Sequence, residues 1–216
     1  MKRVALGVIA VGMVGCASPF SGPGPVFPVS AEDRAGTDSF PQALRETTLR
    51  CGVFGVGGGQ REMSRVTDWY GGHLRAAGET PLFRSTGSSL RFTWLRSFDA
   101  PVVIRLETGA DGAVTMTATE LSGRGGYEPG SVARRIERRL TAGEVTALAR
   151  MMAQSGVLKQ TAATCDIGLD GAGWAVESAG ADGYRFIERQ SPADGPVRTF
   201  GLHLIGLTGW TYDRVY

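Results

Sequence analysis

The sequence predicts an α+β domain: an antiparallel sheet, made of a meander plus a hairpin, with two or three helices packed on one face. Apolar residues alternate with polar ones over 90–94, 102–107 and 114–119, which indicates the strands of a meander. A strand, turn and strand pattern over 170–188 indicates the hairpin. Apolar residues spaced by three and four over 63–77 indicate a helix.

The first helices lie on either side of a glycine-rich segment. A short helix is expected within 39–49, and residues 51–59 contain too many glycines for regular structure over their whole length. The helix over 63–77 is weakened by Gly71-Gly72. Its apolar stripe consists of Met63, Val66, Tyr70 and Leu74.

The remaining elements follow from local signals. The apolar spacing over 132–140 permits both helix and strand, and strand is favoured because Thr141 and Glu144 resemble a capping box that starts a new helix. That helix is expected to end at Gly156. A last helix is expected over 196–209, with proline at its first turn.

The N-terminus has the order of a signal peptide. Met1-Lys2-Arg3 is a positive segment, and residues 4–14 form an uncharged apolar run. About eleven residues at 1.5 Å each cover about half of a bilayer core of roughly 30 Å, so the run is too short to span a membrane. Met13-Val14-Gly15-Cys16 resembles the lipobox of bacterial lipoproteins, with methionine where leucine is usual.

This resemblance implies that residues 1–15 are a lipoprotein signal peptide and that lipid on Cys16 anchors the mature chain to a membrane of the cell envelope. Ala17 stands where aspartate would indicate retention in the inner membrane, so the outer membrane, facing the periplasm, is favoured, and the inner membrane stays open. An ordinary secretory signal with a chance cysteine is the alternative. Residues 16–42 are rich in Pro, Gly and Ser and are expected to form a tether, which leaves 43–216 as one domain.

Composition and motifs exclude several kinds of chemistry. Loss of Lys2 and Arg3 with the signal peptide brings the formal charge from +2 to about zero, so no nucleic-acid partner is expected. Without HExxH or paired CxxC spacing, His73 and His203 do not predict a metal site. The glycine cluster at 55–60 lacks the last glycine of GxGxxG and a P-loop lysine, and GxSxG and SxxK are absent. We therefore expect no cofactor and no catalytic residue.

Two cysteines remain once Cys16 is lipidated. In the oxidising periplasm, a disulfide between Cys51 and Cys165 is the simplest pairing. It would close a loop of over a hundred residues and stabilise the fold by about 4 kcal/mol. A free buried thiol and an intermolecular bridge are the alternatives.

The predicted hairpin carries a group of aromatic and charged residues that can bind a glycan. The group consists of Trp174, Glu177, Tyr184, Glu188 and Arg189. The alternative is structural: Trp174 packs in the core, and the charged residues form ion pairs, because Trp174 and Val176 share the face opposite Glu177.

Residues 83–210 also resemble bacterial proteins of unknown function. The shared order comprises Asp170, Trp174, Glu177, Gly183-Tyr184 and Arg189-Gln-Ser191-Pro192. The resemblance implies one compact domain and carries no chemistry.

Three functions fit these observations. The first is a non-catalytic envelope lipoprotein whose domain binds a protein or glycan partner. The second is an envelope hydrolase that uses carboxylates such as Glu177 and Glu188, which would have to share one exposed cleft. The third is an immunity-type inhibitor that neutralises a toxin in the periplasm.

Overall fold

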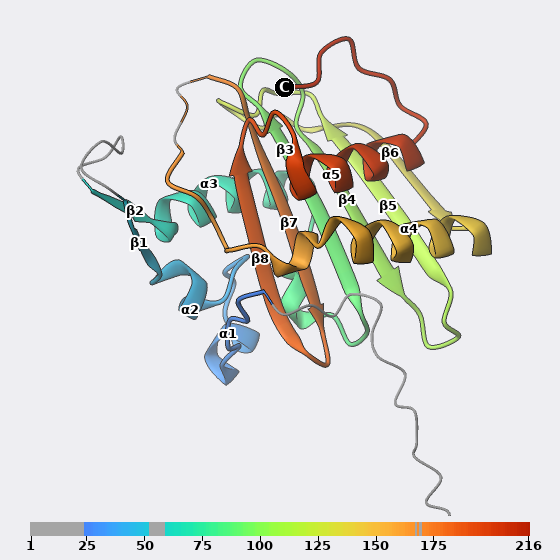
Figure 1. The fold of residues 1–216 in the computed structure, drawn as a ribbon, viewed down its shortest axis with the longest axis horizontal. Helices are drawn as coiled ribbons and strands as arrows, with labels where there is room; N and C mark the ends of the chain where they lie inside the picture. Colours follow the sequence, from blue (N-terminus) through green and yellow to red (C-terminus); the bar gives the residue numbers. More distant parts are fainter. Residues whose placement is uncertain (1–23, 52–58, 167, 169) are drawn as a thin grey trace, which may run out of the picture.

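The computed structural model describes residues 24–51, 59–166, 168 and 170–216 (Figure 1). Its fold is α+β, as the sequence predicts. The main sheet has six antiparallel strands in the order β6-β5-β4-β3-β7-β8, and β1 and β2 form a separate two-stranded sheet. The strands are β1 (Thr48–Arg50), β2 (Gln60–Glu62), β3 (Ser89–Arg96), β4 (Val102–Thr108), β5 (Val114–Leu121), β6 (Val132–Arg139), β7 (Ala172–Gly180) and β8 (Gly183–Gln190).

The expected meander and hairpin are confirmed. Strands β3 to β6 follow one another as a meander, and the β7–β8 hairpin joins it where β7 pairs with β3. The helices are α1 (Ala31–Ala35), α2 (Gln42–Arg45), α3 (Met63–Ala76), α4 (Ala142–Ser155) and α5 (Gly195–Leu207). Two short 3₁₀ turns, η1 (Leu82–Arg84) and η2 (Val157–Lys159), complete the fold.

Helices cover both faces of the main sheet, whereas the sequence predicts them on one face only. In Figure 1, α4 and α5 lie together on the near face and α3 lies behind the sheet. Alternate residues of each strand point to opposite faces, so each face supplies its own core. One core joins Phe92 and Trp94 of β3 to α4 and α5, and the other joins Leu95 to α2 and α3. Because β3 is covered on both faces, all eight of its residues are buried.

The capping box predicted for α4 is present. The Thr141 hydroxyl accepts a hydrogen bond from the Glu144 amide, and the Glu144 carboxylate accepts one from the Thr141 amide. Gly156 ends the helix in the left-handed conformation, which glycine adopts without strain. Arg138 of β6 donates two hydrogen bonds to the same carboxylate, at 2.7 and 3.0 Å.

Part of the expected tether is packed on the domain. Phe27 forms a bridge with Tyr184 at the outer edge of β8, and Phe40 is 2% exposed. The physical reason is that burying the two aromatic side chains stabilises the packing of this segment. The overall Pro, Gly and Ser content of the segment does not reveal this contribution. Residues 24–42 therefore differ from the expectation and belong with the folded part.

Other expectations fall outside the described residues. They are the signal peptide at 1–15, Cys16 and its lipid, the start of the tether at 16–23, and most of the glycine cluster at 55–60. Among the residues that the structure does describe, no helix combines the length and the apolar character needed to cross a bilayer.

Glu144→Gln is expected to lower the free energy of unfolding at neutral pH by less than about 1 kcal/mol, because it removes a charge that Arg138 and the helix N-terminus stabilise. Arg138 and then the Thr141 amide lower the pKa of Glu144 from 4.5 to about 2. A lowered pKa stabilises the fold above pH 4.5, and this contribution is lost as the pH falls from 4.5 to about 2. Urea titrations of both proteins across this range should show the difference shrink toward zero. A difference that does not shrink would contradict the pairing.

Candidate functional site

The five residues singled out on the hairpin do not form one site. Trp174 is fully buried on the α5 face, where its ring lies 5.2 Å from that of Trp94. Glu177, Tyr184 and Glu188 share the opposite face, toward α3, because Glu177 is paired with Phe186 and Glu188 with Ala175 across the hairpin. Arg189 points away from that face and donates to the Thr161 carbonyl at 3.0 Å.

Glu177 belongs to a buried ion-pair network. Arg91, directly opposite on β3, donates two hydrogen bonds of 2.7 Å to its two carboxylate oxygens. The Tyr184 hydroxyl donates a third, also of 2.7 Å. Glu79 lies near Arg91 and Arg105, at 3.5 and 3.4 Å. With its oxygens occupied, Glu177 links β7 to β3 and β8 and offers little to a ligand.

Burial alone would lower the pKa of Arg91, but the Glu177 carboxylate outweighs this effect and raises it. Burial, and next the Glu177 charge, raise the pKa of Tyr184 well above its ordinary value. Arg91 therefore keeps its charge, and Tyr184 keeps the proton that it donates to Glu177.

Glu188 has a different environment. Its carboxylate is 2% exposed and forms an ion pair of 2.9 Å with Arg61 of β2. Burial raises the pKa of Glu188 above its ordinary value, although Arg61 opposes that effect. Arg61 also donates to the Thr164 carbonyl at 2.5 Å, so one guanidinium joins β2, β8 and the segment that follows η2.

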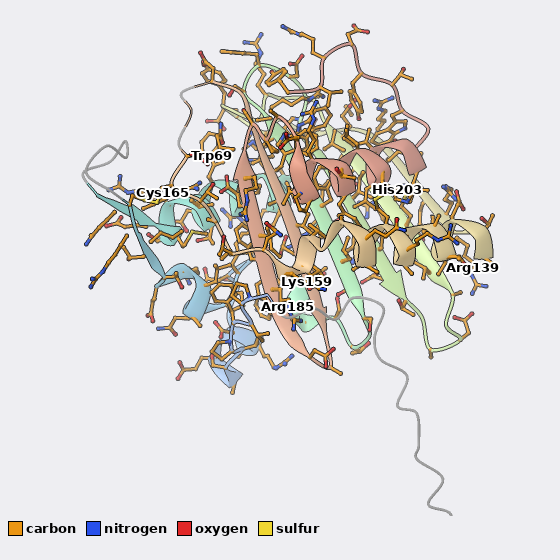
Figure 2. The ribbon with its side chains drawn as sticks, in the orientation of Figure 1. Trp69, Arg139, Lys159, Cys165, Arg185 and His203 are labelled. Carbon is orange, nitrogen blue, oxygen red and sulfur yellow. A yellow bond between two sulfur atoms is a disulfide. The ribbon has the colours of Figure 1, made fainter. Side chains whose placement is uncertain are left out.

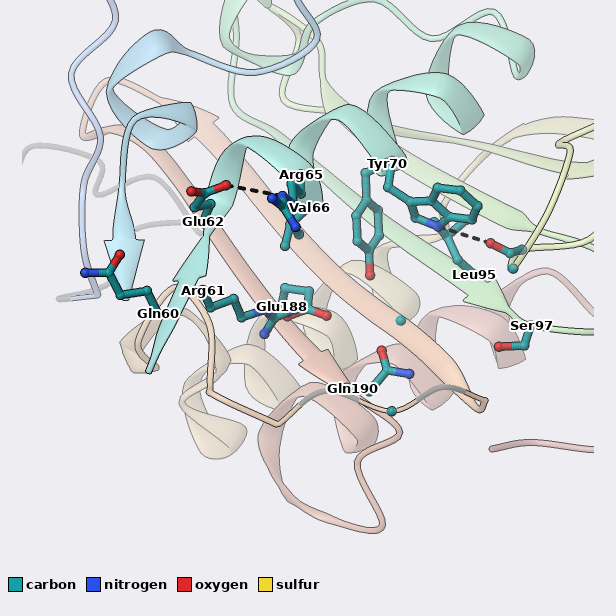
Figure 3. Close-up of a pocket in the computed structure, with 15 residues that line it drawn as sticks. Gln60, Arg61, Glu62, Arg65, Val66, Tyr70, Leu95, Ser97, Glu188 and Gln190 are labelled. Carbon is teal, nitrogen blue, oxygen red and sulfur yellow. Dashed lines mark hydrogen bonds and ion pairs between the residues drawn. The ribbon is translucent and has the colours of Figure 1, made fainter. Parts of the chain in front are cut away.

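A pocket of about 630 Å³ lies beside this pair, between α3 and the sheet. Figure 3 shows Tyr70 of α3 and Gln190 of β8 pointing toward the same space, with Glu188 beside them. Its volume is within the range of about 300–1,000 Å³ that is typical of small-molecule sites. The lining residues are Gln60, Arg61, Glu62, Arg65, Val66, Trp69, Tyr70, Leu95, Ser97, Gly125, Gly126, Gly168, Gly173, Glu188 and Gln190.

Helical spacing supplies one wall of the pocket. Residues 65, 66, 69 and 70 lie at intervals of three and four and so share one face of α3, and Glu62 lies just before its first turn. The opposite wall comes from the ends of β3, β7 and β8, where Gly173 lies between Leu95 and Gln190. A β-carbon on Gly173 would lie 2.4 Å from the Tyr70 hydroxyl oxygen, so glycine leaves the space that this hydroxyl fills.

The Tyr70 hydroxyl is buried in the pocket wall and has no hydrogen-bond partner among the described residues. Burial, and next the charge of Glu188, raise its pKa well above the ordinary value, so it retains its proton and can donate. A buried polar group without a partner costs free energy, and native proteins usually satisfy it. A ligand or water in the pocket would supply the missing acceptor.

The disulfide expected from the sequence is present between Cys51 and Cys165. Cys51 follows β1, and Cys165 follows the Thr164 carbonyl that Arg61 binds (Figure 2). The bridge therefore fixes the two-stranded sheet, which carries Gln60 and Arg61, against the segment between η2 and β7. The disulfide therefore stabilises the same side of the pocket as the contacts of Arg61 with Glu188 and Thr164.

The two histidines are far apart in the fold. His73 is buried in α3, and its Nδ1 lies 3.1 Å from the Trp69 carbonyl oxygen. His203 lies in α5 on the other face of the sheet (Figure 2). In the described part of the chain, no group of three or more His, Cys, Asp or Glu could hold a metal ion.

Of the hairpin group, only Glu188 lines the pocket. The sequence analysis did not single out Arg61, Trp69 or Tyr70, which line the same pocket. The stripe on α3 marked Tyr70 as a core residue, and Arg61 and Trp69 belong to no motif. One signal in the sequence points to Trp69: it lies beside that stripe, on a side of the helix that does not face the core, and a large aromatic side chain there stays exposed.

Glu177→Ala is expected to lower the free energy of unfolding by about 3–5 kcal/mol or to prevent folding, because Arg91 would stay buried without its carboxylate. Tyr184→Phe removes only one hydrogen bond to the same carboxylate and should cost about 1 kcal/mol. Urea titration of the two variants checks this order, and equal losses would show that the bidentate pair is not the main contact.

Comparison with known proteins does not assign the chain to a family. No protein-family model matches the chain. No curated protein matches it significantly either. The function has to be inferred from the pocket and from the N-terminal sequence.

Proposed function

We propose that this chain is a lipid-anchored protein of the bacterial cell envelope whose domain binds an envelope component, without catalysis, in the pocket beneath α3. The lipid anchor is inferred from the lipobox-like sequence that ends at Cys16. The outer membrane, facing the periplasm, is the favoured location. The binding site is the pocket that Tyr70, Arg61 and Glu188 line.

The observation that carries the binding role is the Tyr70 hydroxyl. It is buried in the wall of a ligand-sized pocket and lacks a partner among the described residues. The surrounding wall is rigid, because Arg61 binds both Glu188 and the Thr164 carbonyl and the nearby disulfide fixes the same side. A rigid pocket of this size binds a ligand with little rearrangement of its walls, and the buried hydroxyl beside it needs an acceptor.

The arrangement of carboxylates favours binding over hydrolysis. A two-carboxylate mechanism needs both groups at the reacting bond. Glu177 does not line the pocket, and its oxygens accept from Arg91 and Tyr184. The other carboxylate among the described lining residues is Glu62, which forms an ion pair of 3.2 Å with Arg65.

An envelope hydrolase is the second candidate because of one observation. Glu188 lines the pocket, and burial raises its pKa, as in a general acid. In this alternative, Glu188 would donate a proton to a leaving group and Glu62 would have to leave Arg65 to act as the second carboxylate.

Soluble muropeptides, prepared by digesting peptidoglycan, test the proposed function because they carry both the glycan and the peptide of the envelope polymer. The full chain is expected to bind at least one of them without changing its mass. Tyr70→Phe should weaken binding about five-fold through one lost hydrogen bond, while the free energy of unfolding stays the same or rises. Titration calorimetry, denaturant titration and mass spectrometry of the recovered fragments provide the measurements.

Tyr184→Phe is the matched control, since it removes a buried hydroxyl on the same face of the sheet that does not line the pocket. It should bind like the unaltered chain below its unfolding temperature. If no muropeptide binds, the proposed function is wrong. If fragments are cleaved and Glu188→Gln abolishes the cleavage, the hydrolase is correct.

Cys16→Ser is expected to release the protein from the membrane fraction of expressing cells, because the acyl chains that anchor it would be missing. Mass spectrometry of the N-terminal peptide should show lipid on Cys16 of the unaltered chain and none on the variant. If the chain without the substitution is soluble and carries no lipid, the proposed anchor is wrong.

A further inference from the structure

Three exposed aromatic side chains belong to the pocket lining or to the loops that contribute to it. Six large apolar side chains are exposed in the described part of the chain, and three are Trp69, Phe98 and Tyr127, at 44%, 46% and 57%. Trp69 lines the pocket, and the other two directly follow the lining residues Ser97 and Gly126. Clustered exposed apolar side chains mark a binding surface better than scattered ones do. We call these three residues the aromatic rim.

The aromatic rim is built into the fold. The Trp69 indole donates to the Gly125 carbonyl at 3.1 Å, which ties α3 to the loop after β5. The rings of Phe98 and Tyr127 lie 6.2 Å apart, centre to centre. A β-carbon on Gly125 would lie 2.4 Å from the Arg96 backbone nitrogen, so the two loops meet backbone to backbone. The rings are therefore held in place before any ligand arrives.

The charges that line the pocket are already paired. The two positive residues, Arg61 and Arg65, form ion pairs with the two negative ones, Glu188 and Glu62, at 2.9 and 3.2 Å. Their formal charges cancel. The Arg65–Glu62 pair is exposed and weak, but an ionic ligand would have to compete with the buried Arg61–Glu188 pair, whereas a neutral ligand would leave that pair intact. The pocket therefore favours an uncharged molecule.

Neutral polar groups share the lining with the paired charges. Gln60 and Gln190 each carry a donor and an acceptor, Ser97 has a hydroxyl, and the Tyr70 hydroxyl is a donor without a partner among the described residues. Such groups match hydroxyl and amide substituents. Combined with an exposed indole, they suit a ring that has an apolar face and a polar edge.

We propose that the pocket and the aromatic rim together bind a neutral sugar chain of β-1,4-linked N-acetylhexosamine units, with one sugar in the pocket and the next against Phe98 and Tyr127. This inference rests on the proposed binding function and names its ligand. A pyranose ring presents a face of C–H groups that packs on an aromatic ring, and its hydroxyl and acetamido groups form hydrogen bonds around the edge. Free peptides carry terminal charges for which the paired arginines and glutamates provide no partner.

Chitotetraose, chitobiose and a free stem peptide are the probes, titrated into the full chain by calorimetry. The tetrasaccharide is expected to bind more tightly than the disaccharide, and the peptide is expected not to bind. Trp69→Ala should weaken both sugars about ten-fold, and Tyr70→Phe about five-fold. The double variant Phe98→Ala/Tyr127→Ala should lower the affinity for the tetrasaccharide to that for the disaccharide, which itself stays unchanged.

Leu202→Ala is the matched control, because Leu202 is an exposed apolar residue on α5, away from the rim. It should bind both sugars normally. Thermal unfolding of every variant separates lost contacts from lost folding, and a structural role alone would not produce the dependence on sugar length.

Three results would overturn the inference in different ways. If muropeptides and the stem peptide bind but chitotetraose does not, the glycan is wrong while the proposed function stands. If no muropeptide and no sugar binds, both fail. If the rim variants instead reduce binding to vesicles of phosphatidylcholine and phosphatidylglycerol and leave sugar binding unchanged, the rim contacts a membrane surface.

Discussion

The pairing of β7 with β3 is the constraint on which the rest of the structure depends. It joins the hairpin to the meander and places Trp174 opposite Trp94 and Glu177 opposite Arg91. A shift by one residue would turn every side chain of β7 to the other face. The tryptophan would then leave the α5 core, and Glu177 would leave the guanidinium that neutralises it. The same register places Gly173 beneath Tyr70, so the pocket depends on it as well.

The two buried glutamates of the hairpin differ in how completely their carboxylates are hydrogen-bonded. Both lie on the α3 face, and both are paired with arginine, as buried charges require. Glu177 accepts from a guanidinium on both oxygens and from a tyrosine, so its surroundings are complete. Glu188 lies at the edge of a pocket whose other wall is a helix. One pair therefore stabilises the fold, and the other belongs to the surface that the proposed function uses.

Much of the fold could be predicted from local patterns, and much less of the site. Alternation of apolar residues indicated the strands, and the capping box at Thr141 with glycine at 156 indicated both ends of α4. The site was harder to predict, because the apolar stripe of α3 does not include Arg65 and Trp69, which line the pocket. Trp174 and Glu177 looked like a binding group, yet β3 supplies the aromatic and the arginine that cover them.

Most of the secondary structure and the α+β class follow from the sequence alone, because apolar period and capping depend on neighbours in sequence. The cysteine count favoured a Cys51–Cys165 disulfide but left a free thiol and an intermolecular bridge open. Which face each helix covers, the packing of residues 24–42 and the pocket required the folded arrangement. The pocket is lined by β2, α3, the ends of three strands and three connecting loops. No local pattern records that Arg61 meets Glu188, because the contact arises only when distant segments pack and exclude water from both charges.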